Sequence, residues 1–310
     1  MTLRCRSTVG HTDDGGRQSR VVDQGFGEVS AVTDLSFALE AGTITGFLGP
    51  NGAGKTTTLR MILGLAAPTS GRALVFDHPY AELPRAALRI GAVLEATDFH
   101  PGRSGRDHLR MLGQAVDVPD SRAEEVLRLV ELGDAARRRV KGYSLGMRQR
   151  LGLAVALLGD PELLILDEPA NGLDPEGVRW LREFLRRLAS EGRTVLISSH
   201  VLAEVAQTVD RVLIISRGRL VLSSSLAELT ARAGGAVRVR SRDPQRLTAA
   251  LRDEALQVTT GTDHALLVQG TSSERVGEIA FAAGVPVHEL VNDGGVLEDI
   301  FLELTSEAPA

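Results

Sequence analysis

The chain has 310 residues, enough for one large domain or two modest ones. Its residues are 43% hydrophobic and 24% charged, a composition typical of a soluble globular protein with a substantial core. The net charge of −5 at pH 7 argues against a general nucleic-acid-binding protein, which would present a basic face, so we expect no nucleic acid among its partners. Cys5 is the only cysteine, which excludes a disulfide framework and a thiolate metal site.

The sequence shows no sign of a membrane-embedded segment. No apolar run approaches the roughly 18 residues that a transmembrane helix needs. The first residues also lack the apolar core of a signal peptide. We therefore expect the protein in a reducing cytoplasm, with any action at a membrane going through a partner.

The first twenty residues are polar and rich in glycine, aspartate, arginine and serine, and they show no periodic pattern. This composition predicts a disordered tail over residues 1–20, with folding starting near Val21. Alternating apolar positions in residues 29–39 then predict a strand.

Residues 49–56 read Gly-Pro-Asn-Gly-Ala-Gly-Lys-Thr and fit the phosphate-loop pattern G-x-x-x-x-G-K-[ST] at every fixed position. A β-rich run precedes them and apolar residues at helical spacing follow, which is the strand–loop–helix context that this motif requires. Backbone N–H groups of such a loop cradle phosphate oxygens, and the following helix adds its positive end. Lys55 can reach the β- and γ-phosphates, and the Thr56 hydroxyl can bind Mg²⁺. The expected phosphate-binding residues are Gly49, Pro50, Asn51, Gly52, Ala53, Gly54, Lys55, Thr56 and Thr57.

The stretch after this loop predicts further strands and a helical region. Strands are expected over residues 72–76 and 90–95, the second of which ends on Glu95. Apolar residues at i, i+3, i+4 spacing predict helices over residues 103–139, which would form a smaller helical subdomain. Ser144 is well placed to cap the helix that follows.

Residues 163–166 are four apolar residues, and Asp167 and Glu168 come directly after them. This pattern predicts a buried parallel strand that delivers two carboxylates to its C-terminal edge. Active sites of open α/β sheets lie at that edge. A second buried strand over residues 194–198 leads to His200, and a hairpin is expected over residues 211–222.

The pattern changes after residues 233–235, which we interpret as a domain joint. The elements beyond it are expected in the order β-α-β-β-α-β, which predicts a small ferredoxin-like module, followed by a closing helix over residues 297–304. The expected domains are therefore residues 21–232 and residues 236–305.

The order of these motifs resembles the nucleotide-binding subunit of an ABC transporter over about residues 21–222. The phosphate loop matches that family's Walker A motif, and residues 163–168 match its Walker B motif. Residues 171–174 resemble the D-loop, and His200 resembles the switch histidine. The resemblance implies an α/β fold: a P-loop NTPase core of the ABC ATPase type, with an antiparallel β subdomain and a helical subdomain, plus the small C-terminal α+β module.

The resemblance also assigns roles. ATP and Mg²⁺ are the implied cofactors, with Thr56 and Asp167 holding the metal ion. Glu168 would act as general base on the attacking water, while Lys55 and His200 would stabilise the transferring phosphoryl group. Phe26, which lies between two glycines, sits where the family has a base-stacking aromatic; packing in the core is the alternative for that ring. Asp174 belongs to the D-loop.

Two motifs depart from the family pattern. Residues 143–147, Tyr-Ser-Leu-Gly-Met, resemble the signature L-S-G-G-Q and match it at Ser144 and Gly146, which in the family face the γ-phosphate of the opposite subunit. Glu95 stands where the family has the Q-loop glutamine. Its carboxylate can still offer an oxygen to Mg²⁺ or water, but its charge is expected to weaken ATP binding or to make binding more dependent on Mg²⁺.

The Glu95 exchange and the C-terminal helix both resemble the antibiotic-exporter branch, typified by daunorubicin-resistance ATPases. The implied partners are a second copy of the chain, held by ATP, and separate transmembrane permease subunits. The chain would then lie peripherally on the cytoplasmic face of the membrane, touching it only through its partner.

Other classes of ATPase and GTPase fit less well. A GTPase would need N-K-x-D, and neither lysine of the chain has that context. A DNA-repair ATPase would carry a long coiled coil between Walker A and the signature. A pure binding module would not need the intact set of Lys55, Asp167, Glu168 and His200. A soluble ABC ATPase that acts on the ribosome remains the alternative.

Overall fold

The computed structural model describes residues 4–6, 24–26, 29–33, 35–94, 99–232, 237–261, 265–292 and 295–306. The chain divides into two compact units, one within Met1–Ser223 and the other formed by Ser224–Glu307. Each unit is described by itself.

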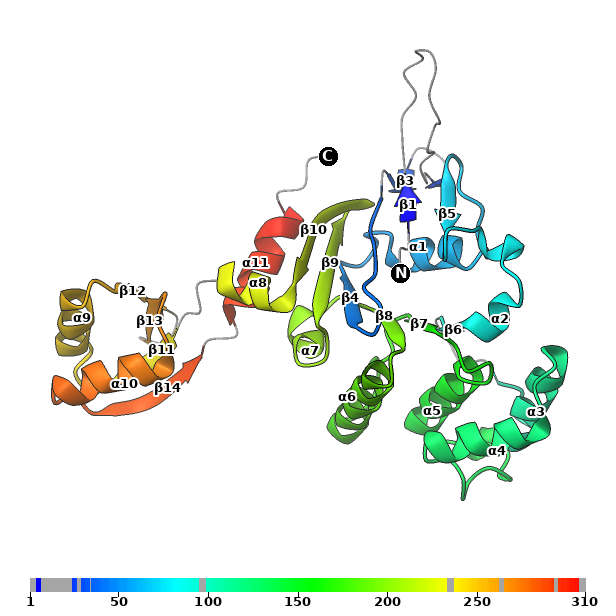
Figure 1. The fold of residues 1–310 in the computed structure, drawn as a ribbon. Helices are drawn as coiled ribbons and strands as arrows, with labels where there is room; N and C mark the ends of the chain where they lie inside the picture. Colours follow the sequence, from blue (N-terminus) through cyan, green and yellow to red (C-terminus); the bar gives the residue numbers. More distant parts are fainter. Residues whose placement is uncertain are drawn as a thin grey trace, which may run out of the picture. The chain divides into compact units, whose positions relative to one another are not determined.

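The first unit is built on a six-stranded sheet in the order β10-β9-β4-β8-β7-β6 (Figure 1). Its strands are β4 (Ile44–Leu48), β6 (Ile90–Val93), β7 (Leu163–Leu166), β8 (Thr194–Ser199), β9 (Arg211–Ser216) and β10 (Arg219–Ser225). Strand β4 pairs in parallel with β8 and β9, and β7 pairs in parallel with β6 and β8. Every residue of β4, β7 and β8 is buried, as expected for a parallel sheet covered on both faces. The loops after these three strands therefore meet at one edge of the sheet.

Helices cover this sheet and present apolar faces to it. They are α1 (Lys55–Ile62), α2 (Ala86–Arg89), α5 (Leu145–Ala156), α6 (Pro175–Ser190) and α7 (Leu202–Ala206). Helix α6 contacts β8 and β4, and α5 contacts β6. The apolar residues of α6 fall at helical spacing, and Leu181, Phe184, Leu185 and Leu188 are buried. Asp174 caps α6 by accepting a hydrogen bond of 2.8 Å from the backbone N–H of Gly177.

The first unit also contains two short antiparallel strand pairs that are separate from the six-stranded sheet. Strand β2 (Gln24–Phe26) pairs with β3 (Val29–Val32), and β1 (Arg4–Arg6) pairs with β5 (Arg72–Leu74). The expected disordered tail thus contains one short strand, because residues without an apolar pattern can still satisfy their backbone groups along a sheet edge. The other residues of the tail lie outside the described part of the chain.

The predicted strand over residues 29–39 is shorter than its alternating pattern. Its ladder ends at Val32, and residues 35–40 are in no helix or strand. Leu35, Phe37 and Leu39 are nevertheless buried in the core. The alternating apolar residues therefore indicate an extended chain with one buried face. Such a chain does not have to pair with a neighbouring strand.

The predicted helical subdomain contains α3 (Gly105–Ala115) and α4 (Asp120–Leu129), which pack on each other and on α5. Ser104 caps α3 by accepting a hydrogen bond from the backbone N–H of Asp107 at 3.1 Å. Pro119 immediately precedes α4 and separates it from α3. The region therefore holds two helices and connecting turns.

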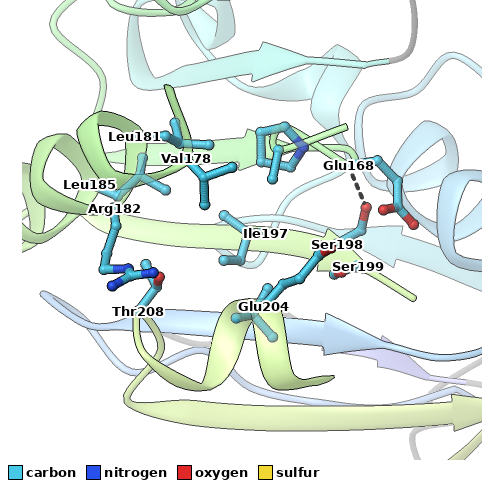
Figure 2. A pocket seen from close by; sticks show the side chains of 13 residues that line it. Glu168, Val178, Leu181, Arg182, Leu185, Ile197, Ser198, Ser199, Glu204 and Thr208 are labelled. Atoms are coloured by element: carbon cyan, nitrogen blue, oxygen red, sulfur yellow. Dashed lines mark hydrogen bonds between the residues drawn. The ribbon is translucent and has the colours of Figure 1, made fainter. Parts of the chain in front are cut away.

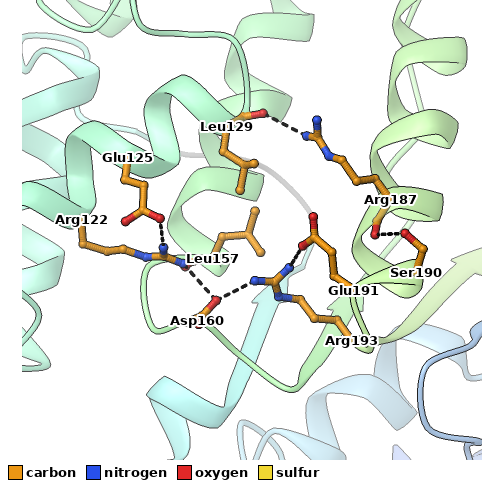
Figure 3. Close-up of polar contacts among 9 residues, drawn as sticks. All are labelled: Arg122, Glu125, Leu129, Leu157, Asp160, Arg187, Ser190, Glu191 and Arg193. Carbon is orange, nitrogen blue, oxygen red and sulfur yellow. Dashed lines mark hydrogen bonds and ion pairs between the residues drawn. The ribbon is translucent and has the colours of Figure 1, made fainter.

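A cluster of charged residues joins the helical subdomain to the core (Figure 3). Asp160 follows α5 and lies between Arg122 of α4, at 3.2 Å, and Arg193 just before β8, at 2.7 Å. Arg122 also donates hydrogen bonds to the carbonyl oxygens of Leu157 and Leu158 at the end of α5. These contacts satisfy helix-end acceptors and connect three segments that are distant in sequence.

The Asp160→Asn substitution should lower the free energy of unfolding by up to about 1 kcal/mol near pH 7, because Asp160 is largely exposed. The Arg193 hydrogen bond and the nearby arginine charges hold the pKa of Asp160 below its usual value. Its stabilising effect is therefore full above the unfolded-state pKa of about 3.9 and is lost as the pH falls through the lower folded-state pKa.

Urea unfolding of both proteins, from pH 7 down to the lowest pH at which the wild type stays folded, measures this effect. The gap between wild type and Asp160→Asn should narrow below about pH 4. Asparagine suits this test because Asp160 has a φ of 56°, a conformation that asparagine tolerates. A gap that is independent of pH would contradict the explanation by charge.

The second unit contains a four-stranded antiparallel sheet in the order β12-β13-β11-β14. Its elements are α8 (Leu226–Arg232), β11 (Val237–Ser241), α9 (Pro244–Asp253), β12 (Gln257–Thr260), β13 (Leu266–Gln269), α10 (Ser273–Ala282), β14 (Val287–Asn292) and α11 (Gly295–Ser306). From β11 to β14 the element order is the predicted β-α-β-β-α-β. Buried apolar residues of α9, α10 and the sheet form a separate core. Among the described residues of the whole chain, no helix has the length and apolar character needed to cross a membrane.

Candidate functional site

The phosphate loop runs from the end of β4 to the start of α1, as the sequence predicted. A β-carbon at Gly49 would collide with the carbonyl oxygen of Ile215 on β9, so only glycine fits there. Gly54, which directly precedes α1, has a φ of 99°, which also favours glycine. These two glycines bring the loop close to the sheet and turn it into the helix, whose N-terminal N–H groups are free to face an anion.

A polar hollow of about 350 Å³ lies over this loop. It is lined by Asn51, Gly52, Gly54, Lys55, Thr56, Thr57, Glu168, Asn171 and His200. The loop after β4 therefore meets the loops after β7 and β8, as expected for the carboxyl edge of a parallel sheet. The structure brings together the predicted residues that a bound phosphate chain would need.

Lys55 lies at the base of this hollow and is only 7% exposed. Its ammonium donates hydrogen bonds to the carbonyl oxygens of Gly49 at 2.7 Å and Pro50 at 3.3 Å. It also lies 3.5 Å from Oε1 of Glu168. A buried cation held by carbonyl oxygens and one carboxylate is well suited to bind an anion.

The carboxylate of Asp167 is 5% exposed and is bonded by two hydroxyl groups. Thr56 Oγ1 donates to Asp167 Oδ2 at 2.7 Å, and Ser198 Oγ donates to Asp167 Oδ1. A buried carboxylate whose hydroxyl partners carry no charge is costly unless a cation offsets it. Thr56 and Asp167 thus offer adjacent oxygen ligands, which suit Mg²⁺.

Glu168 links the phosphate loop to the end of β8. Its Oε2 lies 3.0 Å from Nδ1 of His200, and its Oε1 faces Lys55. Its side chain is 17% exposed, so it is shielded but still borders the hollow. The carboxylate can accept a proton from a water molecule in the hollow, and His200 can orient it.

The N-terminus of α5 is built as predicted but does not line this hollow. Ser144 caps the helix by accepting a hydrogen bond of 3.2 Å from the backbone N–H of Met147. Tyr143, at a position where the motif departs from the family, is buried and donates to the carbonyl oxygen of Ala135 at 2.8 Å. Gly146 is the second residue of this helix. Any contact of Ser144 or Gly146 with a nucleotide on another subunit stays a prediction.

The remaining predicted residues have different outcomes. Asp174 serves as the N-cap of α6 and does not line the hollow. Phe26 ends β2, and its side chain lies outside the described part of the structure. Glu95 lies outside the described residues, two positions after the end of β6. The proposed roles of all three residues stay predictions.

Sequence reasoning missed Asn171 and Ser198. Asn171 lines the hollow and lies in the predicted D-loop, of which only Asp174 was singled out. Ser198 bonds Asp167 and the backbone of Glu168. The sequence shows that two serines, Ser198 and Ser199, follow the apolar residues 195–197, but it does not show which of them bonds the acidic pair.

Comparisons with known proteins agree with this site. The family model described as ABC transporter matches residues 32–171, which contain the phosphate loop and the Asp167–Glu168 pair. A second model, a domain of unknown function (DUF8746), matches residues 235–298 in the second unit.

Curated relatives cover most of the chain. The uncharacterized ABC transporter ATP-binding protein YhcH of Bacillus subtilis is 38% identical over 280 residues, 89% of this chain and 91% of that protein. The daunorubicin resistance ATP-binding protein DrrA3 of Streptomyces coeruleorubidus is 34% identical over 91% of this chain and 93% of its own. The bacitracin transport ATP-binding protein BcrA of Bacillus licheniformis is 44% identical over 63% of this chain and 65% of its own.

Solved structures with a similar fold cover about two thirds of the chain. A structure of an ATP-binding subunit of an ABC transporter has a TM-score of 0.62 and 27% identity, covering 69% of this chain and 91% of that chain. An ATP-binding cassette solved as a dimer bound to ADP and Pi has a TM-score of 0.57 and 23% identity, covering 66% of this chain and 95% of that chain. Fold and site therefore define an ATP-binding cassette protein. The chain belongs to the ATP-binding proteins of the ABC transporter family.

Proposed function

We propose that the chain is the Mg²⁺-dependent ATPase subunit of an ABC-type membrane exporter, and that antibiotics are the class of cargo. The observation that supports this proposal most directly is the hollow in which Lys55, Thr56, Glu168 and His200 meet, with Asp167 bonded to Thr56 beside it. These residues are the groups that phosphoryl transfer to water requires: cations, metal ligands and a base.

ATP binding rests on the phosphate loop. Backbone N–H groups of the loop and of the first turn of α1 would hold the phosphates, and Lys55 would offset their charge. Phe26 would stack on the base, as its place in the resemblance implies. The second copy of the chain would complete the site with Ser144 and Gly146, while Asp174 would act within the D-loop at that interface.

Thr56 and Asp167 would hold Mg²⁺, since their oxygens are adjacent and Asp167 is a buried carboxylate. Glu95 would contribute a further oxygen. When bound, the ion would supply positive charge that stabilises the phosphate oxygens during transfer.

Hydrolysis needs a base that is held in place. Glu168 would take the proton from the attacking water, because its carboxylate borders the hollow. His200, 3.0 Å from that carboxylate, would orient it and face the transferring group. Lys55 would stabilise the negative charge that develops on the phosphate.

The names of the relatives support the exporter assignment. BcrA is named for bacitracin transport and DrrA3 for daunorubicin resistance, and both are ATP-binding proteins. An ATP-binding subunit of this kind would work beneath separate transmembrane permease subunits at the cytoplasmic face of the membrane. The helical region over residues 103–139 and the loop with Glu95 would receive the permease.

Co-purification tests this function. Tagged protein carrying Glu168→Gln is isolated with Mg-ATP from detergent-solubilised cells, and the bound proteins are identified by mass spectrometry against an untagged strain. A multi-span membrane protein is the expected companion, and its identity would lead to the cargo. Ribosomal proteins without a membrane protein would overturn the exporter assignment in favour of a soluble ATPase that acts on the ribosome.

A further inference from the structure

The hydroxyl of Ser198 lies between the two acidic residues that follow β7. Ser198 belongs to β8 and has no exposed surface. Its Oγ donates to Oδ1 of Asp167. It also accepts a hydrogen bond of 2.8 Å from the backbone N–H of Glu168 (Figure 2). One hydroxyl thus uses its donor on one residue and an acceptor site on the next.

The bond to Glu168 holds an unfavourable backbone conformation. Glu168 has a φ of 47°, in the left-handed region, which is unfavourable for a residue with a β-carbon. Its N–H is held by Ser198, and its carbonyl oxygen accepts from the backbone N–H of Asn171 at 3.1 Å. The direction of the Glu168 side chain follows from this conformation, so Ser198 helps to aim the carboxylate at the hollow.

The bond to Asp167 fixes the other carboxylate. Thr56 of α1 holds one oxygen of Asp167 and Ser198 of β8 holds the other, so two elements determine the plane of the carboxylate. Hydrogen bonds that orient a metal ligand are typically worth 10–100-fold in metal affinity or activity.

We propose that Ser198 is a positioning residue, which sets the orientation of the Asp167 carboxylate toward Mg²⁺ and of the Glu168 carboxylate toward water. This proposal rests on the function proposed above. Strand β8 then holds the site at two points, since it also leads to His200, which contacts the Glu168 side chain. A buried hydroxyl with a merely structural role would affect stability and leave metal binding and turnover unchanged.

The first test compares ATP turnover in Ser198→Ala, Ser198→Thr and Ser104→Ala. Ser198→Ala should lower kcat or raise the Mg²⁺ concentration for half-maximal rate about 10–100-fold, with little change in the KM for ATP. Ser198→Thr keeps the hydroxyl and should restore most of the loss. Ser104→Ala is the control, because that serine is also buried but caps α3 and does not line the hollow.

The second test needs no turnover. Mn²⁺ binding to the ATP-loaded full chain is measured by electron paramagnetic resonance in the Glu168→Gln background, with and without Ser198→Ala. Loss of the Ser198 hydroxyl should weaken Mn²⁺ binding about 10–100-fold. A wild-type chain without Mg²⁺-stimulated turnover would overturn the proposed function, while the Mn²⁺ measurement would still decide the role of Ser198.

Thermal unfolding of each variant separates positioning from stability. The positioning role is overturned if Ser198→Ala lowers the melting temperature but binds Mn²⁺ like its parent protein. It is also overturned if Ser198→Thr melts like the wild type and yet is as impaired as Ser198→Ala.

Discussion

Glu168→Gln is expected to lower the rate of ATP hydrolysis about 10²–10⁴-fold, the range typical for loss of a general base. Glutamine has nearly the same shape as glutamate, and the backbone N–H of residue 168 can still donate its hydrogen bond to Ser198. The change therefore removes the proton acceptor while leaving the loop as it is. Release of inorganic phosphate at saturating Mg-ATP measures the effect.

The same variant should bind ATP at least as tightly as the wild type, because it removes a negative charge that lies 3.5 Å from Lys55 and borders the phosphate hollow. With hydrolysis blocked, we expect ATP to hold two chains together, which light scattering with and without ATP would detect. Glu162→Gln is the matched control. That glutamate immediately precedes β7, is 58% exposed and pairs with Arg89 at 2.9 Å, so its loss should leave turnover near the wild-type rate. A Glu168→Gln rate within twofold of the control would refute the assignment of the base.

The sequence was most informative where spacing alone dictates geometry. The apolar run 163–166 predicted a buried parallel strand with Asp167 and Glu168 at its end, and β7 is that strand. His200 was expected at the end of the next strand, and β8 places its ring 3.0 Å from Glu168. Both outcomes follow from the rule that parallel strands bring their carboxyl ends to one edge.

Contacts that depend on a single hydroxyl were beyond prediction. Nothing in the spacing of residues 194–200 says that Ser198, and not Ser199, bonds the acidic pair; the register of β8 against β7 decides it, with Leu166 beside Ile197. The positive φ of Glu168 could not be predicted from the sequence either, since glutamate has no preference for that conformation. The short strand Arg4–Arg6 was missed for a related reason, because edge pairing needs only backbone groups.

Lys55→Met is expected to weaken ATP binding about 10–100-fold, the equivalent of one hydrogen bond to a charged group of about 1.5–3 kcal/mol. Turnover should fall further, by about 10²–10³-fold, since the charge also stabilises the transferring phosphate. Methionine approximates the length of the lysine stem, so the buried space that Lys55 occupies stays filled. Calorimetric titration with ATP measures the affinity, and phosphate release measures the rate.

The chain provides its own control, because Lys141 is its only other lysine. Lys141 is exposed and lies in the short 3₁₀ helix Val140–Gly142, so Lys141→Met makes the same chemical change away from the hollow. If net charge alone governed nucleotide binding, both variants would bind ATP equally weakly. If the phosphates bind at the end of β4, only Lys55→Met should lose affinity for ATP. Equal affinities of both variants for ATP would therefore place the phosphates elsewhere. A loss of affinity confined to Lys55→Met would place the phosphates in the hollow.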